Sequence, residues 1–198
     1  MFIFLSGYLT KTENENWVHF IKKRCIRVLI PYVIWSIVYT LPSFSLHRLA
    51  FNLVTTKSAY TLYYVFVYMQ LVILTPLLCS AAKSSHKWII ELVFPAYMLI
   101  INYLLPIPTG NGVLQILDSV NCLGWISYYY LGLLLGNRIV RIRMSDKLLF
   151  ITLLIALALQ MAEGYLFFIR GVDNPGTQMK LTAWLTSVVI MLLSVRFI

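Results

Sequence analysis

Charged residues are scarce in this sequence and make up only 12% of its 198 residues. A soluble domain carries roughly 25% charged residues, because polar groups have to cover its surface in water. Hydrophobic residues here account for 60%. The balance excludes a soluble globular domain and indicates a multi-pass helical membrane protein.

Sites that depend on cysteine, on histidine or on a signature motif are also missing. The three cysteines are odd in number and have no CxxC or metal-ligand spacing, which argues against a disulfide framework and a metal site. No HExxH, Walker or GxSxG motif is present, and no Ser-His-Asp arrangement. His19, His47 and His86 are expected in loops beside basic residues, so none is placed as a general base within a span. We therefore predict no metal ion and identify no catalytic residue.

Long apolar stretches dominate what is present. Seven follow one another along the chain, at residues 1–10, 28–46, 58–82, 92–117, 119–137, 148–169 and 181–195. A helix needs about 20 apolar residues to cross a bilayer, so 1–10 is a partial span. The fourth span is expected to end near Pro106, before an outer loop. The predicted fold is an all-α, polytopic membrane helix bundle of about seven segments, in a single transmembrane domain over residues 1–198.

The basic residues lie in the short connections between these stretches, so the net charge of +9 does not indicate a nucleic-acid partner. If the first connection is cytoplasmic and the segments alternate, 12 of the 16 lysines and arginines lie inside and 4 outside. An excess of basic residues on the cytoplasmic side is the usual bias of membrane proteins. We therefore predict that the first loop is cytoplasmic.

One connection has a pattern of its own. Leu46, Leu49, Ala50 and Leu53 have the i, i+3, i+4, i+7 spacing of a helix that lies flat in the membrane interface. An ordinary loop with scattered apolar residues explains the same pattern equally well.

The densest positive charge, Lys22-Lys23-Arg24-Cys25-Ile26-Arg27, runs directly into the apolar stretch 28–46. Arg24 and Arg27 are three residues apart and share one helix face. Two guanidinium groups can hold a phosphate by charge-assisted hydrogen bonds, and at a cytoplasmic membrane edge that phosphate belongs to a soluble cofactor or a lipid headgroup. Anchoring alone explains the same residues, because each basic residue near an anionic membrane surface contributes about 1 kcal/mol.

Glu163 interrupts the apolar stretch 148–169. A charge at that depth costs roughly 2.5–3.5 kcal/mol, which makes an ionisable side chain there a candidate functional residue. The carboxyl group could be protonated, bonded to Gln160 or paired toward Arg170. A structural polar contact between helices is the alternative.

Two other features are expected to be structural. Glu91 comes three residues after Trp88, directly before the fourth apolar stretch, and is expected at the membrane interface. Tyr128, Tyr129 and Tyr130 are expected to form a packing or lipid-facing aromatic cluster rather than a ligand site.

An ordered set of motifs resembles the acyltransferase-3 family of integral membrane acyltransferases. Residues 2–9, FIFLSGYL, are similar to the Phe-Phe-x-x-Ser-Gly-Phe/Tyr-Leu stretch in the family's second span. The family then has a Trp, a Phe, a basic run closing on Arg-x-x-Arg, and Pro-Tyr. Here these are Trp17, Phe20, Lys22, Lys23, Arg24, Arg27, Pro31 and Tyr32. Three later motifs resemble the following spans, namely residues 62–64, residues 74–78, and residues 129–132 with Gly136.

The resemblance implies a bacterial inner-membrane O-acyltransferase. Such an enzyme moves an acetyl or similar acyl group from acyl-CoA to a hydroxyl group of a cell-envelope carbohydrate. It also implies that Arg24 and Arg27 face the cytoplasm and bind acyl-CoA, with membrane lipids as the surrounding partners.

The resemblance implies a missing part as well. The family's first span carries an Arg and a His that is taken as the catalytic base, and further spans follow its middle part. This chain opens on what resembles the second span, so we expect it to be the middle of a larger domain. Removing a positioned general base lowers a rate typically about 10²–10⁴-fold, so we expect little activity from the chain alone.

A non-enzymatic carrier or a flippase for a lipid-linked glycan is the alternative function. Transporters often contain inverted repeats with broken helices in matching halves. The sequence shows no such repeat, which favours the enzyme without excluding the carrier.

Overall fold

The computed structural model describes residues 2–13, 16–41, 45, 63–98, 100, 121–171 and 180–196. Within these residues the regular structure is entirely helical. The α-helices are α1 (Phe2–Tyr8), α2 (Trp17–Thr40), α4 (Tyr63–Lys83), α5 (Ile89–Met98), α7 (Ile126–Gly136), α8 (Asp146–Ile169) and α9 (Leu181–Arg196). A short 3-10 turn, η4 (Cys122–Gly124), precedes α7. The all-α prediction is confirmed, with one helix in each of the seven apolar stretches.

Two of these helices, α4 and α8, are long and apolar enough to cross a membrane by length and composition. The shorter helices α7 and α9 are also apolar. A bundle of such helices is typical of a membrane protein, because every backbone polar group is then paired within its own helix.

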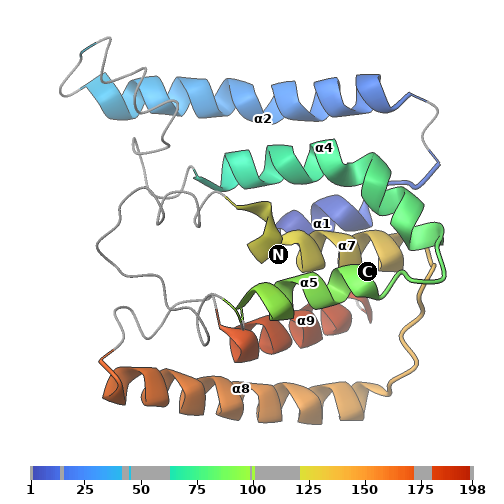
Figure 1. The fold of residues 1–198 in the computed structure, drawn as a ribbon, viewed down its shortest axis with the longest axis vertical. Helices are drawn as coiled ribbons and strands as arrows, with labels where there is room; N and C mark the ends of the chain where they lie inside the picture. Colours follow the sequence, from blue (N-terminus) through green and yellow to red (C-terminus); the bar gives the residue numbers. More distant parts are fainter. Residues whose placement is uncertain are drawn as a thin grey trace.

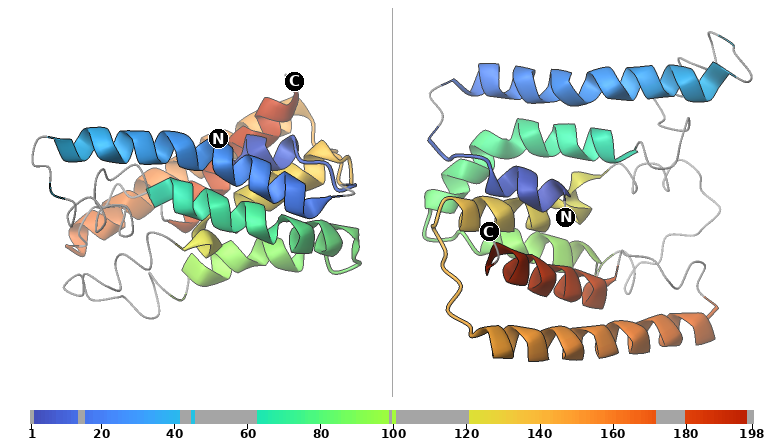
Figure 2. Two further views of the ribbon diagram at one scale, coloured as in Figure 1. Left: turned by 90° about the horizontal axis from the view of Figure 1, so that it is seen from above. Right: turned by 180° about the vertical axis from the view of Figure 1, so that it is seen from behind.

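The helices lie side by side, and α7 is at the centre (Figure 1). It contacts α1, α4 and α5, and every residue from 126 to 135 is buried. The outer helices α2 and α8 lie at opposite edges of the bundle (Figures 1 and 2), where α2 packs on α4 and α8 packs on α9. Within α8 only Leu149, Ala156 and Phe167 are buried, as expected for a helix that faces lipid.

The α1–α2, α4–α5 and α7–α8 connections all lie at one end of the bundle (Figure 1). We call this the basic end, because it carries Lys11, Lys83, Lys87, Arg138, Arg141 and Arg143. Arg170 and Lys180 follow α8 and precede α9 at the other end. The helices therefore alternate in direction as the charge pattern requires.

The second helix starts earlier than the apolar stretch predicted. The side chain of Asn16 accepts a hydrogen bond from the backbone N–H of His19 at 3.0 Å, which satisfies a free donor of the first turn and lets α2 begin at Trp17. The basic run therefore lies inside the helix and not before it. The prediction of a loop at His19 was wrong for the same reason.

Two predictions fall outside the described residues. These are the interfacial helix of residues 46–53, with His47, and the outer loop after Pro106.

Three glycines bring the backbones of α1 and α7 into direct contact. A Cβ atom on Gly7 would lie 2.0 Å from the carbonyl oxygen of Tyr129, and one on Gly132 would lie 2.2 Å from that of Phe4. A Cβ atom on Gly136 would lie 1.9 Å from the carbonyl oxygen of Tyr8. Small residues at a helix crossing permit this close approach, which drives association inside a membrane by van der Waals packing. The crossing fixes α1 on the central helix.

Gly132→Ala should therefore destabilise the protein. Alanine gains up to about 1 kcal/mol of helix propensity over glycine. Its methyl group would meet the backbone of α1, however, and overpacking of this kind costs about 1–3 kcal/mol. The free energy of unfolding in detergent micelles should fall. Ala158→Leu, on the exposed surface of α8, is the control and should change the free energy by no more than about 0.5 kcal/mol. An unchanged or raised stability of Gly132→Ala would contradict this crossing.

Candidate functional site

Arg24 lies in the first half of α2 and binds the end of α1. Its Nη1 donates to the Ser6 hydroxyl at 2.9 Å and to the Ser6 carbonyl oxygen at 3.2 Å. The guanidinium also lies over the Phe20 ring, 4.6 Å from the centroid. The Ser6 carbonyl is one of the last four in α1, which have no partner within the helix, and it accepts from both Arg24 and the Thr10 hydroxyl, the latter at 2.7 Å. Arg24 is thereby held half-buried between α2 and α1.

Further hydroxyl groups lie beside this contact, because the Thr10 hydroxyl donates to the Ser6 carbonyl and is 3.4 Å from the Tyr129 hydroxyl. The Ser6 hydroxyl donates to the Tyr68 hydroxyl at 3.1 Å. Tyr129 and Thr75 share a hydrogen bond of 2.8 Å, and Thr75 donates its own proton to the Leu71 carbonyl at 3.0 Å. Tyr129 must therefore be the donor to Thr75. Inside a membrane such paired hydroxyl groups hold neighbouring helices in one arrangement.

Arg27 lies one helical turn after Arg24 and is exposed. It forms no hydrogen bond or ion pair within the described residues, so its donors are available. Its planar fork suits an anionic oxygen ligand, because a guanidinium presents five N–H groups. The two arginines that the spacing predicted as a pair therefore differ in their surroundings. Arg24 is hydrogen-bonded to Ser6 of α1, whereas Arg27 is exposed.

Glu163 of α8 contacts the start of α9. One carboxylate oxygen accepts the backbone N–H of Thr182 at 3.2 Å and also the Thr182 hydroxyl. Thr182 is the second residue of α9, so its N–H is one of the first four that the helix itself leaves unpaired. A carboxylate at this point both caps the helix and interacts favourably with its dipole. Of the alternatives drawn from the sequence, this geometry favours the structural contact between helices.

Glu91, which was expected at the membrane interface, forms polar contacts with α7 and α9. Its Oε2 accepts the Ser127 hydroxyl at 2.5 Å, and Ser127 Oγ accepts the Trp184 indole N–H at 3.0 Å. Glu91 Oε1 is buried, with no hydrogen-bond partner among the described residues. The apolar surroundings of Glu91 in Ile89-Ile90-Glu91-Leu92-Val93 were the signal that could have identified it, since a lone acid within an apolar helix is unusual.

The three adjacent tyrosines of α7 are all buried, so they pack within the bundle and do not face lipid. Tyr128 packs on Phe94 of α5, with ring centroids 5.5 Å apart. Tyr129 points to Thr10 and Thr75, and Tyr130 is three residues after Ser127 on the same face of α7. Within the described part of the chain, no three His, Cys, Asp or Glu side chains are grouped to hold a metal ion.

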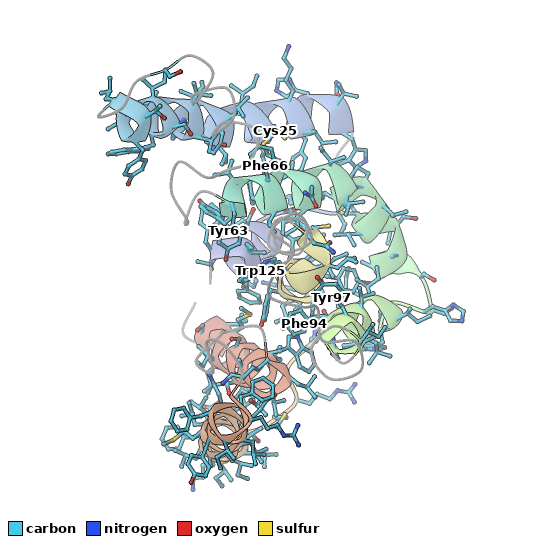
Figure 3. All side chains as sticks on the ribbon, turned by 60° about the vertical axis from the view of Figure 1, so that its left-hand side comes forward. Cys25, Tyr63, Phe66, Phe94, Tyr97 and Trp125 are labelled. Carbon is cyan, nitrogen blue, oxygen red and sulfur yellow. The ribbon has the colours of Figure 1, made fainter. Side chains whose placement is uncertain are left out.

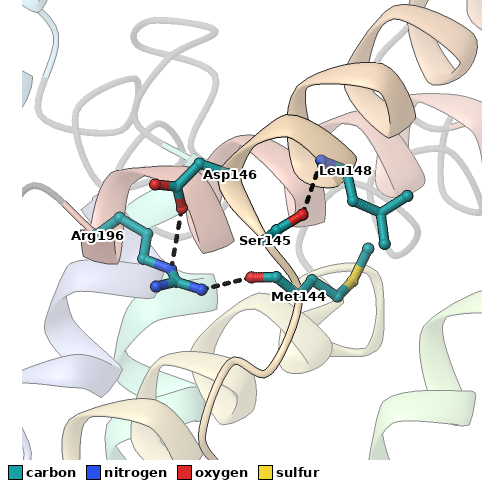
Figure 4. Close-up of polar contacts among 5 residues, drawn as sticks. All are labelled: Met144, Ser145, Asp146, Leu148 and Arg196. Carbon is teal, nitrogen blue, oxygen red and sulfur yellow. Dashed lines mark hydrogen bonds and ion pairs between the residues drawn. The ribbon is translucent and has the colours of Figure 1, made fainter.

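Polar contacts join α8 and α9 at two places along the pair. At the basic end, Arg196 of α9 forms an ion pair with Asp146 of α8 at 3.5 Å and donates to the Met144 carbonyl at 2.5 Å (Figure 4). The Ser145 hydroxyl accepts the Leu148 N–H at 3.4 Å and caps α8 (Figure 4). These contacts join α8 and α9 at the basic end, and Glu163 joins them at the other end. Polar contacts thus join α8 to α9, and a second set of polar contacts joins α1, α2 and α4.

Comparison with known proteins gives one match. A family model of the acyltransferase-3 type, described as an acyltransferase domain, matches residues 1–198. No curated protein and no solved structure matches the chain.

The contact of Glu163 with Thr182 leads to a stability prediction. Glu163→Ala removes both accepted hydrogen bonds and should lower the free energy of unfolding by about 1–3 kcal/mol. Glu163→Gln keeps one acceptor oxygen and should cost less. In a double-mutant cycle with Thr182→Val, the two changes should be non-additive. Additive effects would show that the two side chains do not act together, and would return Glu163 to the candidate functional residues.

Proposed function

The chain belongs to the acyltransferase family whose model it matches, and on that premise we propose that it takes part in O-acyl transfer from acyl-CoA to a hydroxyl group of a cell-envelope carbohydrate. The reaction joins the acceptor oxygen to the acyl carbon and breaks the carbon–sulfur bond of the thioester. The acceptor hydroxyl loses its proton, and the coenzyme A thiolate gains one. A membrane protein with a cytoplasmic donor and an acceptor in the envelope is suited to this transfer.

The proposed donor site rests on the exposure of the Arg27 guanidinium. It is an exposed guanidinium on α2, without a partner among the described residues, and it stands next to an arginine that is already engaged. Coenzyme A carries phosphate groups, which are the anions that a guanidinium binds best. We assign Arg27 to direct contact with these phosphates.

Arg24 has a positioning role in this proposal. Its bonds to Ser6 and its contact with Phe20 hold the first half of α2 against α1. The α1–α7 crossing holds α1 in turn. Arg27 is therefore held at a fixed position beside the bundle. This lowers the conformational entropy that is lost when a ligand binds.

We further propose that the basic end faces the cytoplasm of a bacterial cell and that the helices span its inner membrane. The lysines and arginines gathered at this end support that orientation. Acyl-CoA is made and used in the cytoplasm, so the proposed donor site and the orientation agree. Membrane lipids then cover the outer faces of α2 and α8.

The donor site is tested by acetyl-CoA binding to the purified protein in nanodiscs. Arg27→Ala should weaken binding by about 10- to 100-fold, because a hydrogen bond to a charged group contributes about 1.5–3 kcal/mol. Arg24→Ala should weaken binding and also lower thermal stability, since it leaves the Ser6 carbonyl without that donor. The two measurements are affinity by isothermal titration and unfolding by tryptophan fluorescence.

Lys22→Ala is the matched control. Lys22 carries the same charge on α2 and is exposed, but it lies five residues before Arg27, and at 3.6 residues per turn the two side chains are on different faces of the helix. It should change acetyl-CoA affinity by less than about threefold. If Arg27→Ala and Lys22→Ala behave alike, and both change only abundance or orientation in the membrane, then the basic run serves for anchoring and the proposed donor site is wrong.

A further inference from the structure

Glu91 ends a chain of hydrogen bonds whose direction is fixed. The Trp184 indole N–H can only donate, so Ser127 Oγ accepts there and gives its single proton to Glu91 Oε2. Ser127 is completely buried and has no proton left for another partner. Glu91 Oε2 is satisfied by this arrangement, while Oε1 is free to bind something else.

Three buried polar atoms around this chain have no hydrogen-bond partner within the described residues: Glu91 Oε1, the Tyr130 hydroxyl and the Trp125 indole nitrogen. Buried polar groups of folded proteins are nearly always paired, and each exception calls for an explanation. Tyr130 is three residues after Ser127 on α7, so it shares the helix face on which Ser127 contacts Glu91. The Trp125 ring is 5.9 Å from that of Tyr128, and Tyr128 in turn packs on Phe94, which lies one helical turn after Glu91 on α5.

Together the three atoms match one kind of ligand group. A carboxylate oxygen accepts, an indole N–H donates and a phenol does both. A hydroxyl group donates one hydrogen bond and accepts others, so it can satisfy Glu91 Oε1 and one of the two donors at once. A phosphate would be repelled by the carboxylate, and an aliphatic chain would leave all three atoms unpaired.

The walls of this region are aromatic. Phe94 stacks on Trp184 with ring centroids 6.0 Å apart, and Phe94, Tyr97 and Trp125 lie in the region between α5, α7 and α9 (Figure 3). Ring faces offer flat apolar surfaces beside the polar atoms. A sugar has the same combination, with hydroxyl groups at its edge and apolar C–H faces on its ring.

The region also adjoins the proposed donor side of the molecule. Tyr129 bonds to Thr75 and lies 3.4 Å from the Thr10 hydroxyl, which donates to the same Ser6 carbonyl as Arg24. Its neighbour Tyr130 is on the α7 face of Ser127, which contacts Glu91. The adjacent residues Tyr129 and Tyr130 of α7 thus lie next to the polar contacts of Arg24 and of Glu91, respectively. Glu91 is in the first turn of α5, which follows the α4–α5 connection at the basic end, and its partner Ser127 is fully buried near the start of α7.

We propose that Glu91 binds a hydroxyl group of the carbohydrate acceptor through its free oxygen, with Tyr130 or Trp125 donating to the same hydroxyl. This inference rests on the proposed function and names the part of the protein that recognises the acceptor. Ser127 and Trp184 hold the carboxylate in place. The atoms are covered in this structure, so the proposal requires the side chains around them to move when the acceptor enters.

Glu91→Gln tests the assignment with little change of shape. The amide oxygen still accepts the Ser127 hydroxyl, but the acceptor atom at Oε1 is replaced by an NH₂ donor. Carbohydrate released from the host's cell envelope serves as the probe, and labelled acetyl-CoA is the donor, with the complete gene product in nanodiscs. The carbohydrate concentration that gives half the maximal rate should rise roughly 10- to 100-fold. Acetyl-CoA affinity and the thermal midpoint should stay unchanged.

Glu163→Gln is the matched control, since it makes the same substitution at another carboxylate of the apolar helices, and it should leave the half-maximal carbohydrate concentration unchanged. A Glu91→Gln protein that folds and binds acetyl-CoA, but whose half-maximal carbohydrate concentration is that of the parent, would overturn the inference and leave Glu91 with a buried water or a structural role only. Failure of the parent protein to bind acetyl-CoA would instead reject the proposed function. The two failures are therefore distinguishable.

Discussion

The backbone contact between α1 and α7 is the constraint on which the polar arrangement of this protein depends. Gly7, Gly132 and Gly136 let the two helices approach until carbonyl oxygens occupy the space of a side chain. Without this approach Ser6 would not be held beside Arg24, and Tyr129 would not reach Thr10 and Thr75 together. Lipid supplies no hydrophobic force between helices, so close packing and hydrogen bonds have to determine the arrangement. The three glycines provide the packing, and the hydroxyl groups provide the hydrogen bonds.

Two arginines of one motif differ in their surroundings, and this difference shapes the proposed donor site. Arg24 completes the end of α1 and lies over Phe20, whereas Arg27 is exposed one turn later. The structural Arg24 fixes the position of the neighbouring exposed Arg27, so less conformational entropy is lost when the ligand binds. The same principle applies to Glu91, whose one oxygen is held by Ser127 and whose other oxygen is unpaired within the described residues.

Much of the fold was predictable from the sequence, and the exceptions have identifiable causes. The seven apolar stretches and the basic connections gave the helices and their alternation, because length and charge alone decide both. The start of α2 was misplaced, since Asn16 caps the helix well before the apolar residues begin. The contact of Glu91 with Ser127, which in turn accepts from Trp184, could not be predicted because these residues are far apart in the sequence. Contacts of that kind arise only when the helices pack, and the same holds for the separation of Arg24 from Arg27.

The most direct measurement is a structure of the complete gene product with acetyl-CoA bound. We expect the phosphate groups of the coenzyme at the basic end, within hydrogen-bonding distance of the Arg27 guanidinium, with Arg24 still bound to Ser6. Phosphate groups at the opposite end of the bundle, or held at the basic end without Arg27, would contradict the proposed donor site.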